Sequence, residues 1–348
     1  MGLGFLIGCA ACMALAPLTI RFAWSVGYLD HPEARKLHTS ATALLGGAVV
    51  FVSGAIGWLV ARPLGGEPTQ QAFLAGGAGL ALVVGLWDDR FGMRPSVKLL
   101  GQALAITALL AAGLMPDLGL PLVVTAAITL VVLMALMNAI NFLDNMNGVV
   151  GGLSAIAFLG FAVHSLWVGA GWVAAAQFAL AGGCIGFLPY NFPRARIFLG
   201  DAGSLFLGYS LGASALLAFQ SAPPGWGRAG VALILAYPAF DMSFVVVNRV
   251  REGRKVYEGG KDHSNHRLAS VIRCQKTTVL LTWLVGAALA ASGLAALKLN
   301  QPLPALGLWA LWILFFSLVW RRLSSVPIQS PRPRPEASPT PTISGSVT

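Results

Sequence analysis

The sequence predicts an all-α polytopic membrane protein with about 10–11 transmembrane helices. Of its 348 residues, 56% are hydrophobic and only 10% are charged, whereas soluble domains carry about 25% charged residues. The apolar residues form runs close to the roughly 20 residues that cross a bilayer. Lys and Arg gather between alternate runs, so the net charge of +10 follows the positive-inside rule and gives no reason to expect nucleic-acid binding.

Taken in order, the apolar runs predict one membrane helix each. The predicted spans are 2–24, 41–61, 72–87, 98–115, 119–142, 148–168, 171–188, 204–220, 226–247, 276–297 and 303–320. The first run has no Lys or Arg before Arg21, so it lacks the basic start of a signal peptide and is interpreted as a span. It contains Cys9 and Cys12, a C-x-x-C spacing that favours small helix-packing residues, with a metal site as the alternative.

The basic residues predict how the helices are oriented. If the loop after the first span is cytoplasmic, 19 Lys and Arg lie on that side and 3 on the other. This places the N-terminus outside and the C-terminus in the cytoplasm. The end of the chain is rich in Pro, Ser and Thr and cannot bury a core. We therefore expect a transmembrane catalytic domain over 1–322 and a disordered cytoplasmic tail over 323–348.

Acidic residues gather on the predicted cytoplasmic side. Four of them stand at predicted helix ends beside apolar sequence, namely Asp88, Asp89, Asp144 and Asp201. Carboxylates close together resist ionisation unless a cation joins them. Such a cluster suits a hard divalent cation, above all Mg²⁺ carrying substrate phosphates. The alternative is that each acid caps a helix or pairs with a nearby Arg.

Two short loops have residues suited to phosphate or nucleotide. The loop 143–147 contains no Lys or Arg, and Asn141 precedes it. Gly200 and Gly203 flank Asp201, which lets the backbone approach a phosphate closely at the start of a helix.

The largest predicted cytoplasmic loop carries His263 and His266, which share a face if the segment is helical. We favour contact with phosphate, and zinc remains the alternative because two histidines are too few for an ordinary zinc site. The basic residues Arg249, Arg251, Arg254 and Lys255 suit anionic lipid headgroups.

Five segments in this order resemble the polyprenyl-phosphate N-acetylhexosamine-1-phosphate transferases. The segments are DHPEARKLH (30–38) with GG at 46–47, GLWDDRFGMRPSVKLLGQ (85–102), NAINFLDNMNGVVGG (138–152), NFPRARIFLGDAGSLFLG (191–208) and DHSNHRL (262–268). This family includes the undecaprenyl-phosphate N-acetylglucosamine-1-phosphate transferases and the phospho-N-acetylmuramoyl-pentapeptide transferases. The resemblance spans nearly the whole chain except the tail.

The resemblance implies a reaction and a set of site residues. Enzymes of this family transfer a sugar 1-phosphate from a UDP-N-acetyl sugar to a membrane polyprenyl (undecaprenyl) phosphate, release UMP and need Mg²⁺, with Mn²⁺ as the alternative cation. By resemblance the metal ligands are Asp201 and Asp144, and the catalytic residues are Asp88, Asp89 and His266. The substrate-binding residues implied in the same way are Lys36, Lys98, Asn141, Asn191, His263 and Arg267.

Three positions depart from the family pattern. Ala43 stands near a Pro that usually precedes the first GG, and Asn147 stands where a second acid is common. The last loop has two histidines, His263 and His266, where three are frequent. The missing histidine favours the N-acetylglucosamine branch over a muramoyl-pentapeptide substrate.

The resemblance also implies a location and partners. We expect a multi-pass protein of the bacterial inner membrane with a cytoplasmic active site, acting in cell-envelope glycan synthesis such as lipopolysaccharide or cell wall, and forming a homodimer. The main alternative is a transporter or flippase of lipid-linked sugars, which would place ionisable groups near the bilayer midplane. Only Asp241 lies clearly inside a predicted span. A non-catalytic lipid-binding scaffold is a third interpretation, but it leaves the clustered acids unexplained.

Overall fold

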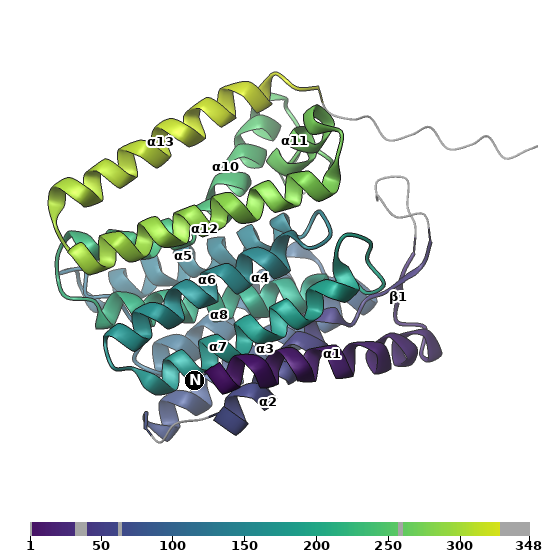
Figure 1. Ribbon diagram of the computed structural model, residues 1–348, viewed down its shortest axis with the longest axis horizontal. Coiled ribbons are helices and arrows are strands. Elements are labelled where there is room, and N and C mark those ends of the chain that lie inside the picture. Colours follow the sequence, from purple (N-terminus) through teal and green to yellow (C-terminus); the bar gives the residue numbers. More distant parts are fainter. Residues whose placement is uncertain (1, 32–39, 62–64, 257–259, 328–348) are drawn as a thin grey trace, which may run out of the picture.

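The chain is described here by a computed structural model covering residues 2–31, 40–61, 65–256 and 260–327. Within these ranges it is a bundle of long helices that run roughly along one direction (Figure 1). The α-helices are α1 (Gly2–Ser25), α2 (Gly46–Ala61), α3 (Pro68–Phe91), α4 (Pro95–Ala111), α5 (Leu122–Leu143), α6 (Val149–Trp167), α7 (Gly171–Asn191), α8 (Gly200–Ser221), α9 (Ala229–Ile234), α10 (Ala236–Arg251), α11 (Ser264–Ile272), α12 (Gln275–Leu299) and α13 (Pro302–Ser324). A 3₁₀ turn, η1 (Trp226–Arg228), precedes α9, and two short strands, β1 (Leu29–Asp30) and β2 (Thr42–Ala43), pair antiparallel.

The helices confirm an all-α polytopic membrane protein. Each predicted span coincides with a helix, and the ninth is η1 and α9 followed by α10 across a 65° bend. In the described ranges, eight helices are long and apolar enough to cross a membrane, or nine with the bent pair. The predicted count of 10–11 is reached only with α2 and α4, which have 16 and 17 residues. At 1.5 Å per residue these helices span about 25 Å, less than the roughly 30 Å hydrocarbon core.

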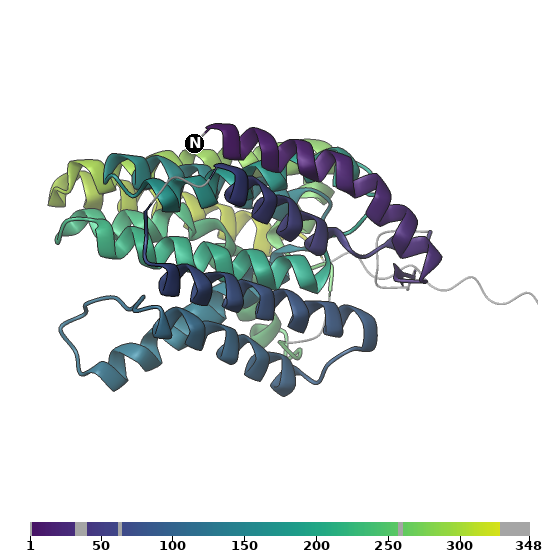
Figure 2. The same ribbon diagram turned by 90° about the horizontal axis from the view of Figure 1, so that it is seen from below.

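Helix α8 is the centre of the bundle. It packs against α2, α3, α5 and α6, and most of its side chains are buried. Figure 2 shows the bundle turned by 90°, with α1 (purple) along one side and α3 and α4 (blue) on the opposite side. Small residues allow this close packing because an added Cβ on Gly47 would lie 2.2 Å from the Gly203 amide nitrogen. A Cβ on Gly85 would lie 2.3 Å from Cα of Ala202, so α3 also touches the start of α8 directly.

Backbone hydrogen bonds join the segment before α2 to the segment before α8. The Phe198 amide donates to the Ala43 carbonyl at 2.8 Å, and the Gly46 amide donates back to Phe198 at 2.9 Å. The Gly47 amide donates to the Leu199 carbonyl at 2.9 Å. Two of the segments that carry the family resemblance, far apart in the chain, are therefore neighbours at one end of the bundle.

The last predicted loop contains a helix that the apolar pattern did not predict. Helix α11 is nine residues long and packs against α10, α12 and α13. Figure 1 shows it at the same end of the bundle as β1. The guanidinium of Arg267 donates to the carbonyls of Leu323, Ser324 and Val326 at 3.3, 3.1 and 2.9 Å.

The predicted domain boundary at 322/323 therefore falls inside α13, which continues to Ser324. Most of the predicted tail, residues 328–348, lies outside the described residues, as does Lys36 in the first loop.

Candidate active site

A polar cavity of about 520 Å³ opens at the end of the bundle where α3 and α5 end and α8 begins. Its wall is formed by acids and amides from the helix ends and by the segment that leads into α11. The lining residues are Asp30, Leu44, Asp89, Asn141, Asp144, Asn145, Met146, Asn147, Asn191, Phe198, Gly200, Asp201, Gly260, Lys261, His266 and Gln275. The acids that the sequence analysis grouped together thus meet in three dimensions.

Asp201, in the first turn of α8, is held by side chains of α4 and α5. Lys98 Nζ lies 2.5 Å from Asp201 Oδ2, and the Asn141 amide donates to Asp201 Oδ1 at 2.6 Å. The same Asn141 nitrogen lies 2.9 Å from Ser204 Oγ, and Lys98 lies 3.3 Å from the Asn141 carbonyl oxygen. The carboxylate of Asp201 therefore has a fixed orientation at the cavity wall.

Asp88 joins the same network through the ammonium of Lys98. Lys98 Nζ lies 2.9 Å from Asp88 Oδ2, and the Met93 amide donates to Asp88 Oδ1 at 2.7 Å. Both side chains are largely buried, with 12% of Asp88 and 16% of Lys98 exposed. One ammonium therefore bridges two carboxylates, Asp88 and Asp201, at a site with little water.

Asp89 points in a different direction from its neighbour. Its two carboxylate oxygens accept the backbone amides of Asp201 and Ala202 at 2.8 and 3.0 Å. A carboxylate at this position caps the start of α8 and interacts favourably with the helix dipole. Gly200 is required beside it, because its φ is +72° and a Cβ would lie 2.5 Å from Asp89 Oδ2. Asp89 therefore ties α3 to the first turn of α8 while it lines the cavity.

Asp144 follows α5 and faces the same cavity as Asp201. Asp144 is exposed to the cavity, but its position deep among protein atoms, together with the nearby charge of Asp201, raises its pKa to about 7. Carboxylates that repel each other in this way form a typical environment for a cation. Among the residues that the structure describes, no three Asp, Glu, His or Cys side chains are arranged to hold one metal ion. Two carboxylates completed by phosphate oxygens and water are the usual Mg²⁺ site, and Asp144 and Asp201 fit that donor set.

Asn191, at the end of α7, is buried and supports the backbone around the cavity. Its side-chain oxygen accepts the Gly148 amide at 2.7 Å, and its nitrogen donates to the Ile197 carbonyl at 3.0 Å. It lines the cavity, and both ends of its amide are engaged by backbone. Its predicted role in substrate binding stays a prediction.

Another part of the cavity wall comes from the segment before α11, from α11 itself and from the start of α12. Gly260, Lys261, His266 and Gln275 line the cavity there, and we call these four residues the basic wall. Burial, reinforced by the charge of His263, lowers the pKa of His266 to about 4. His266 is therefore neutral near pH 7 and able to accept or donate a hydrogen bond.

Among the predicted site residues that the structure describes, four are absent from the cavity lining, namely Asp88, Lys98, His263 and Arg267. Asp88 and Lys98 bond to each other, and Lys98 bonds to the lining residue Asp201. His263 Nδ1 lies 2.8 Å from a carboxylate oxygen of Asp241, and Arg267 binds the carbonyls at the end of α13. Sequence reasoning also missed the lining residues Asp30, Lys261 and Gln275. The signal for Lys261 was present, because it directly precedes the DHSNHRL segment.

Comparison with known proteins identifies the family of the chain. A family model described as glycosyl transferase family 4 matches residues 71–219. A decaprenyl-phosphate N-acetylglucosaminephosphotransferase of Mycolicibacterium smegmatis is 30% identical over 77% of this chain and 74% of its own. The chain belongs to glycosyl transferase family 4.

Further members of the family are similar along most of their length. A probable undecaprenyl-phosphate N-acetylglucosaminyl 1-phosphate transferase of Bacillus subtilis is 28% identical over 81% of both chains. A phospho-N-acetylmuramoyl-pentapeptide-transferase of Desulforudis audaxviator is 30% identical over 85% of this chain and 97% of its own. The glycosyl transferase family 4 match begins in α3 and ends in α8, so it contains all four acids at the helix ends. It does not reach the basic wall.

Proposed function

We propose that this protein transfers N-acetylglucosamine 1-phosphate from UDP-N-acetylglucosamine to a membrane polyprenyl phosphate and releases UMP. The observation that carries the proposal is that Asp144 and Asp201 line one polar cavity in a membrane protein of this family, while Lys98 bridges Asp201 to Asp88. Two of the relatives are named as an undecaprenyl-phosphate and a decaprenyl-phosphate N-acetylglucosamine phosphotransferase, and a third as a phospho-N-acetylmuramoyl-pentapeptide-transferase. The two-histidine loop supports N-acetylglucosamine as the sugar.

Mg²⁺ is the cofactor we propose, held by Asp201 and Asp144 together with the diphosphate of the sugar nucleotide. When bound, it would neutralise charge on the diphosphate, which is the main requirement of phosphoryl transfer. The side chains of the site support this assignment, since Asn141 and Lys98 fix Asp201 while Asp144 has no comparable cationic partner in the described hydrogen bonds.

The other side chains of the cavity have separate roles in this proposal. Asp88 is the carboxylate that handles the lipid phosphate, because Lys98 and the Met93 amide hold it in a fixed position beside Asp201. Lys98 keeps both carboxylates in place and supplies positive charge near the transferred phosphate. Lys261 and His266, on the basic wall, contact the nucleotide or the sugar phosphate from another part of the cavity wall.

We further propose that the cavity faces the cytoplasm of a bacterium across its inner membrane. The excess of Lys and Arg on this side of the chain supports the orientation. A water-soluble sugar nucleotide would enter from the cytoplasm, and the lipid acceptor would enter from the bilayer. The homodimer and the place in cell-envelope glycan synthesis rest on the family resemblance.

The transporter interpretation has less support. Ionisable side chains are gathered at one end of the bundle rather than along a path through it, and the acid inside a span, Asp241, is engaged by α11. A transport path needs polar groups near the midplane that a substrate can reach.

The test is an assay of UMP release by the purified protein with UDP-N-acetylglucosamine, polyprenyl phosphate and Mg²⁺. We expect UMP as the product and expect labelled UMP to exchange into the sugar nucleotide. One diphosphate linkage is broken and another is formed, so the equilibrium constant should lie within about two orders of magnitude of one.

Exchange without lipid acceptor would indicate a covalent enzyme intermediate, and exchange only with lipid would indicate direct attack by the lipid phosphate. Release of UDP in place of UMP would disprove the proposal.

A further inference from the structure

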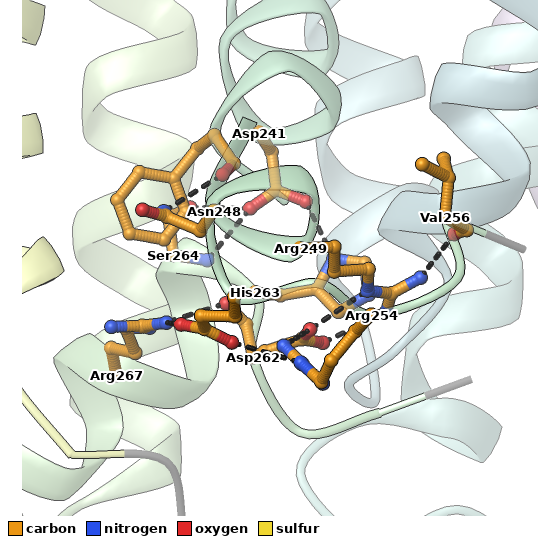
Figure 3. A network of polar contacts seen from close by, with 11 residues as sticks. Asp241, Asn248, Arg249, Arg254, Val256, Asp262, His263, Ser264 and Arg267 are labelled. Carbon is orange, nitrogen blue, oxygen red and sulfur yellow. Dashed lines mark hydrogen bonds and ion pairs between the residues drawn. The ribbon is translucent and has the colours of Figure 1, made fainter. Parts of the chain in front are cut away.

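Asp241, a buried acid in α10, makes its hydrogen bonds with His263 and Ser264, which lie between the residues of the basic wall. Asp241 is 0% exposed. One of its carboxylate oxygens accepts the backbone amide and hydroxyl of Ser264 at 2.9 and 2.5 Å, and the other lies 2.8 Å from His263 Nδ1. Figure 3 shows Asp241 directed from α10 toward Ser264 and His263 at the start of α11. Asp241 thus caps the first turn of α11 from another helix.

A second contact holds the same segment one residue earlier. Asp262 is 1% exposed and accepts two hydrogen bonds from Arg249, both at 2.8 Å, and one from Arg254 at 2.5 Å. In Figure 3 the carboxylate of Asp262 lies between the two guanidinium groups. Although burial opposes ionisation, these hydrogen bonds hold the pKa of Asp262 below its ordinary range. Residues 262–264 are therefore fixed to α10 by charged groups.

The fixed residues lie between the members of the basic wall. Gly260 and Lys261 precede them in sequence, and His266 follows in the first turn of α11. None of the three fixed residues lines the cavity. Burying a carboxylate is unfavourable unless it is paired and hydrogen-bonded, and at Asp241 both conditions are met by His263 and Ser264.

We infer that Asp241 is a positioning residue, which acts through His263 and Ser264 to hold Lys261 and His266 against the sugar-nucleotide side of the cavity. This inference rests on the proposed function. His263 is then a partner of Asp241 rather than a ligand of phosphate, because its Nδ1 is occupied by the carboxylate. The two contacts, at Asp241 and at Asp262, set the basic wall before substrate binds.

The kinetic test is Asp241→Asn, which keeps the shape of the side chain but removes its charge. Its amide nitrogen cannot accept from His263 or Ser264, so the start of α11 is released on one side. We expect KM for UDP-N-acetylglucosamine to rise at least about tenfold, with kcat changed less than about threefold, since the acid side of the cavity is untouched. A purely structural role would lower the active fraction, which reduces kcat and leaves KM unchanged, and that result would overturn the inference.

The matched controls use serines near the two ends of this contact. Ser243→Ala, on the same helix, removes a hydroxyl that bonds to the Ala239 carbonyl of its own helix at 2.7 Å, and should leave KM unchanged.

Ser264→Ala removes one of the bonds to Asp241 and keeps the backbone amide and His263 bonds. It should raise KM in the same direction as Asp241→Asn but by less. A Ser264→Ala enzyme with a larger rise in KM than Asp241→Asn would also contradict the inference.

A second measurement does not depend on turnover. Backbone hydrogen exchange of detergent-solubilised protein, without substrate, should become at least about tenfold faster at residues 260–268 in Asp241→Asn, and remain unchanged in α3 and α8. Unchanged exchange at 260–268, or faster exchange everywhere, would overturn the inference. If the wild-type protein released no UMP, the proposed function would fail, while this measurement would still decide whether Asp241 holds the start of α11.

Discussion

The two sides of the cavity are built in different ways. The acid side, with Asp88, Asp89, Asp144 and Asp201, comes from the ends of long helices in the middle of the bundle. The basic wall comes from a loop and a nine-residue helix near the edge, fixed by Asp241 and Arg249. The acids hold one another through Lys98, Asn141 and backbone amides, whereas the basic wall is held by buried charges that never reach the cavity.

This difference indicates a division of labour. Rigid helix ends suit groups that must keep sub-ångström positions during the reaction, because helices are more precise supports than loops. A loop tied at two points suits the recognition of a sugar nucleotide that enters and leaves. Substitutions on the acid side should therefore alter kcat, and substitutions around the basic wall should alter KM.

The largest expected effect is the loss of activity in Asp201→Asn. Its carboxylate contacts Lys98 and Asn141 and is one of the two proposed Mg²⁺ ligands, so we expect kcat to fall at least about a thousandfold with the protein still folded in detergent. The control is Asp117→Asn, an exposed acid whose contact is with the nearby Gly119 amide. Near-normal turnover of Asp201→Asn at saturating Mg²⁺ would remove Asp201 from the site.

Substitutions of the two adjacent acids, Asp88 and Asp89, should lower kcat alike but differ in their effect on stability. We expect Asp88→Asn and Asp89→Asn each to lower kcat by at least about a hundredfold. Only Asp89→Asn should also lower the melting temperature, because it replaces a carboxylate cap on α8 by an amide that cannot accept both backbone amides. Such caps contribute about 0.5–2 kcal/mol. Loss of less than about tenfold in both variants would leave only the capping role.

The smallest expected effect is a change in stability with pH and Mg²⁺. The folded protein keeps a proton on Asp144 up to about pH 7, whereas the unfolded chain releases it near pH 4. Stability contributed by this group is therefore present at low pH and falls as pH rises from about 4 to 7. Melting temperatures in EDTA should fall over that window, and added Mg²⁺ should raise them more at about pH 8 than at about pH 5.

The matched variant for that measurement is Asp144→Asn, whose side chain carries no charge at any pH in this range. Its melting temperature should depend less on pH and gain less from Mg²⁺. A wild-type protein whose stability in EDTA stays level over the same window, or an Asp144→Asn protein equally stabilised by Mg²⁺, would show that Asp144 is not a ligand.

The sequence predicted the acid side well and the basic wall poorly, for physical reasons. Apolar runs of membrane length fix where helices end, so acids at those ends had to lie near one another. The direction of each carboxylate is a tertiary property, and nothing in the DD pair distinguishes Asp88, bonded to Lys98, from Asp89, bonded to the amides of α8. The sequence also separated Asp241, interpreted as an isolated acid in a span, from His263, interpreted as a phosphate ligand, although they form one pair.

The central place of α8 has a consequence for how the protein is made. Asp89 and the amide of Asp201 that it accepts are separated by 112 residues in the chain. At about 5–20 residues per second, the ribosome needs roughly 6 to 22 seconds between the two. During that interval Asp88 already has its partner Lys98 in α4, whereas the carboxylate of Asp89 lacks the α8 amides that it later accepts. The acid side of the cavity is completed when α8 inserts between helices that were synthesised before it, and the basic wall is synthesised only afterwards.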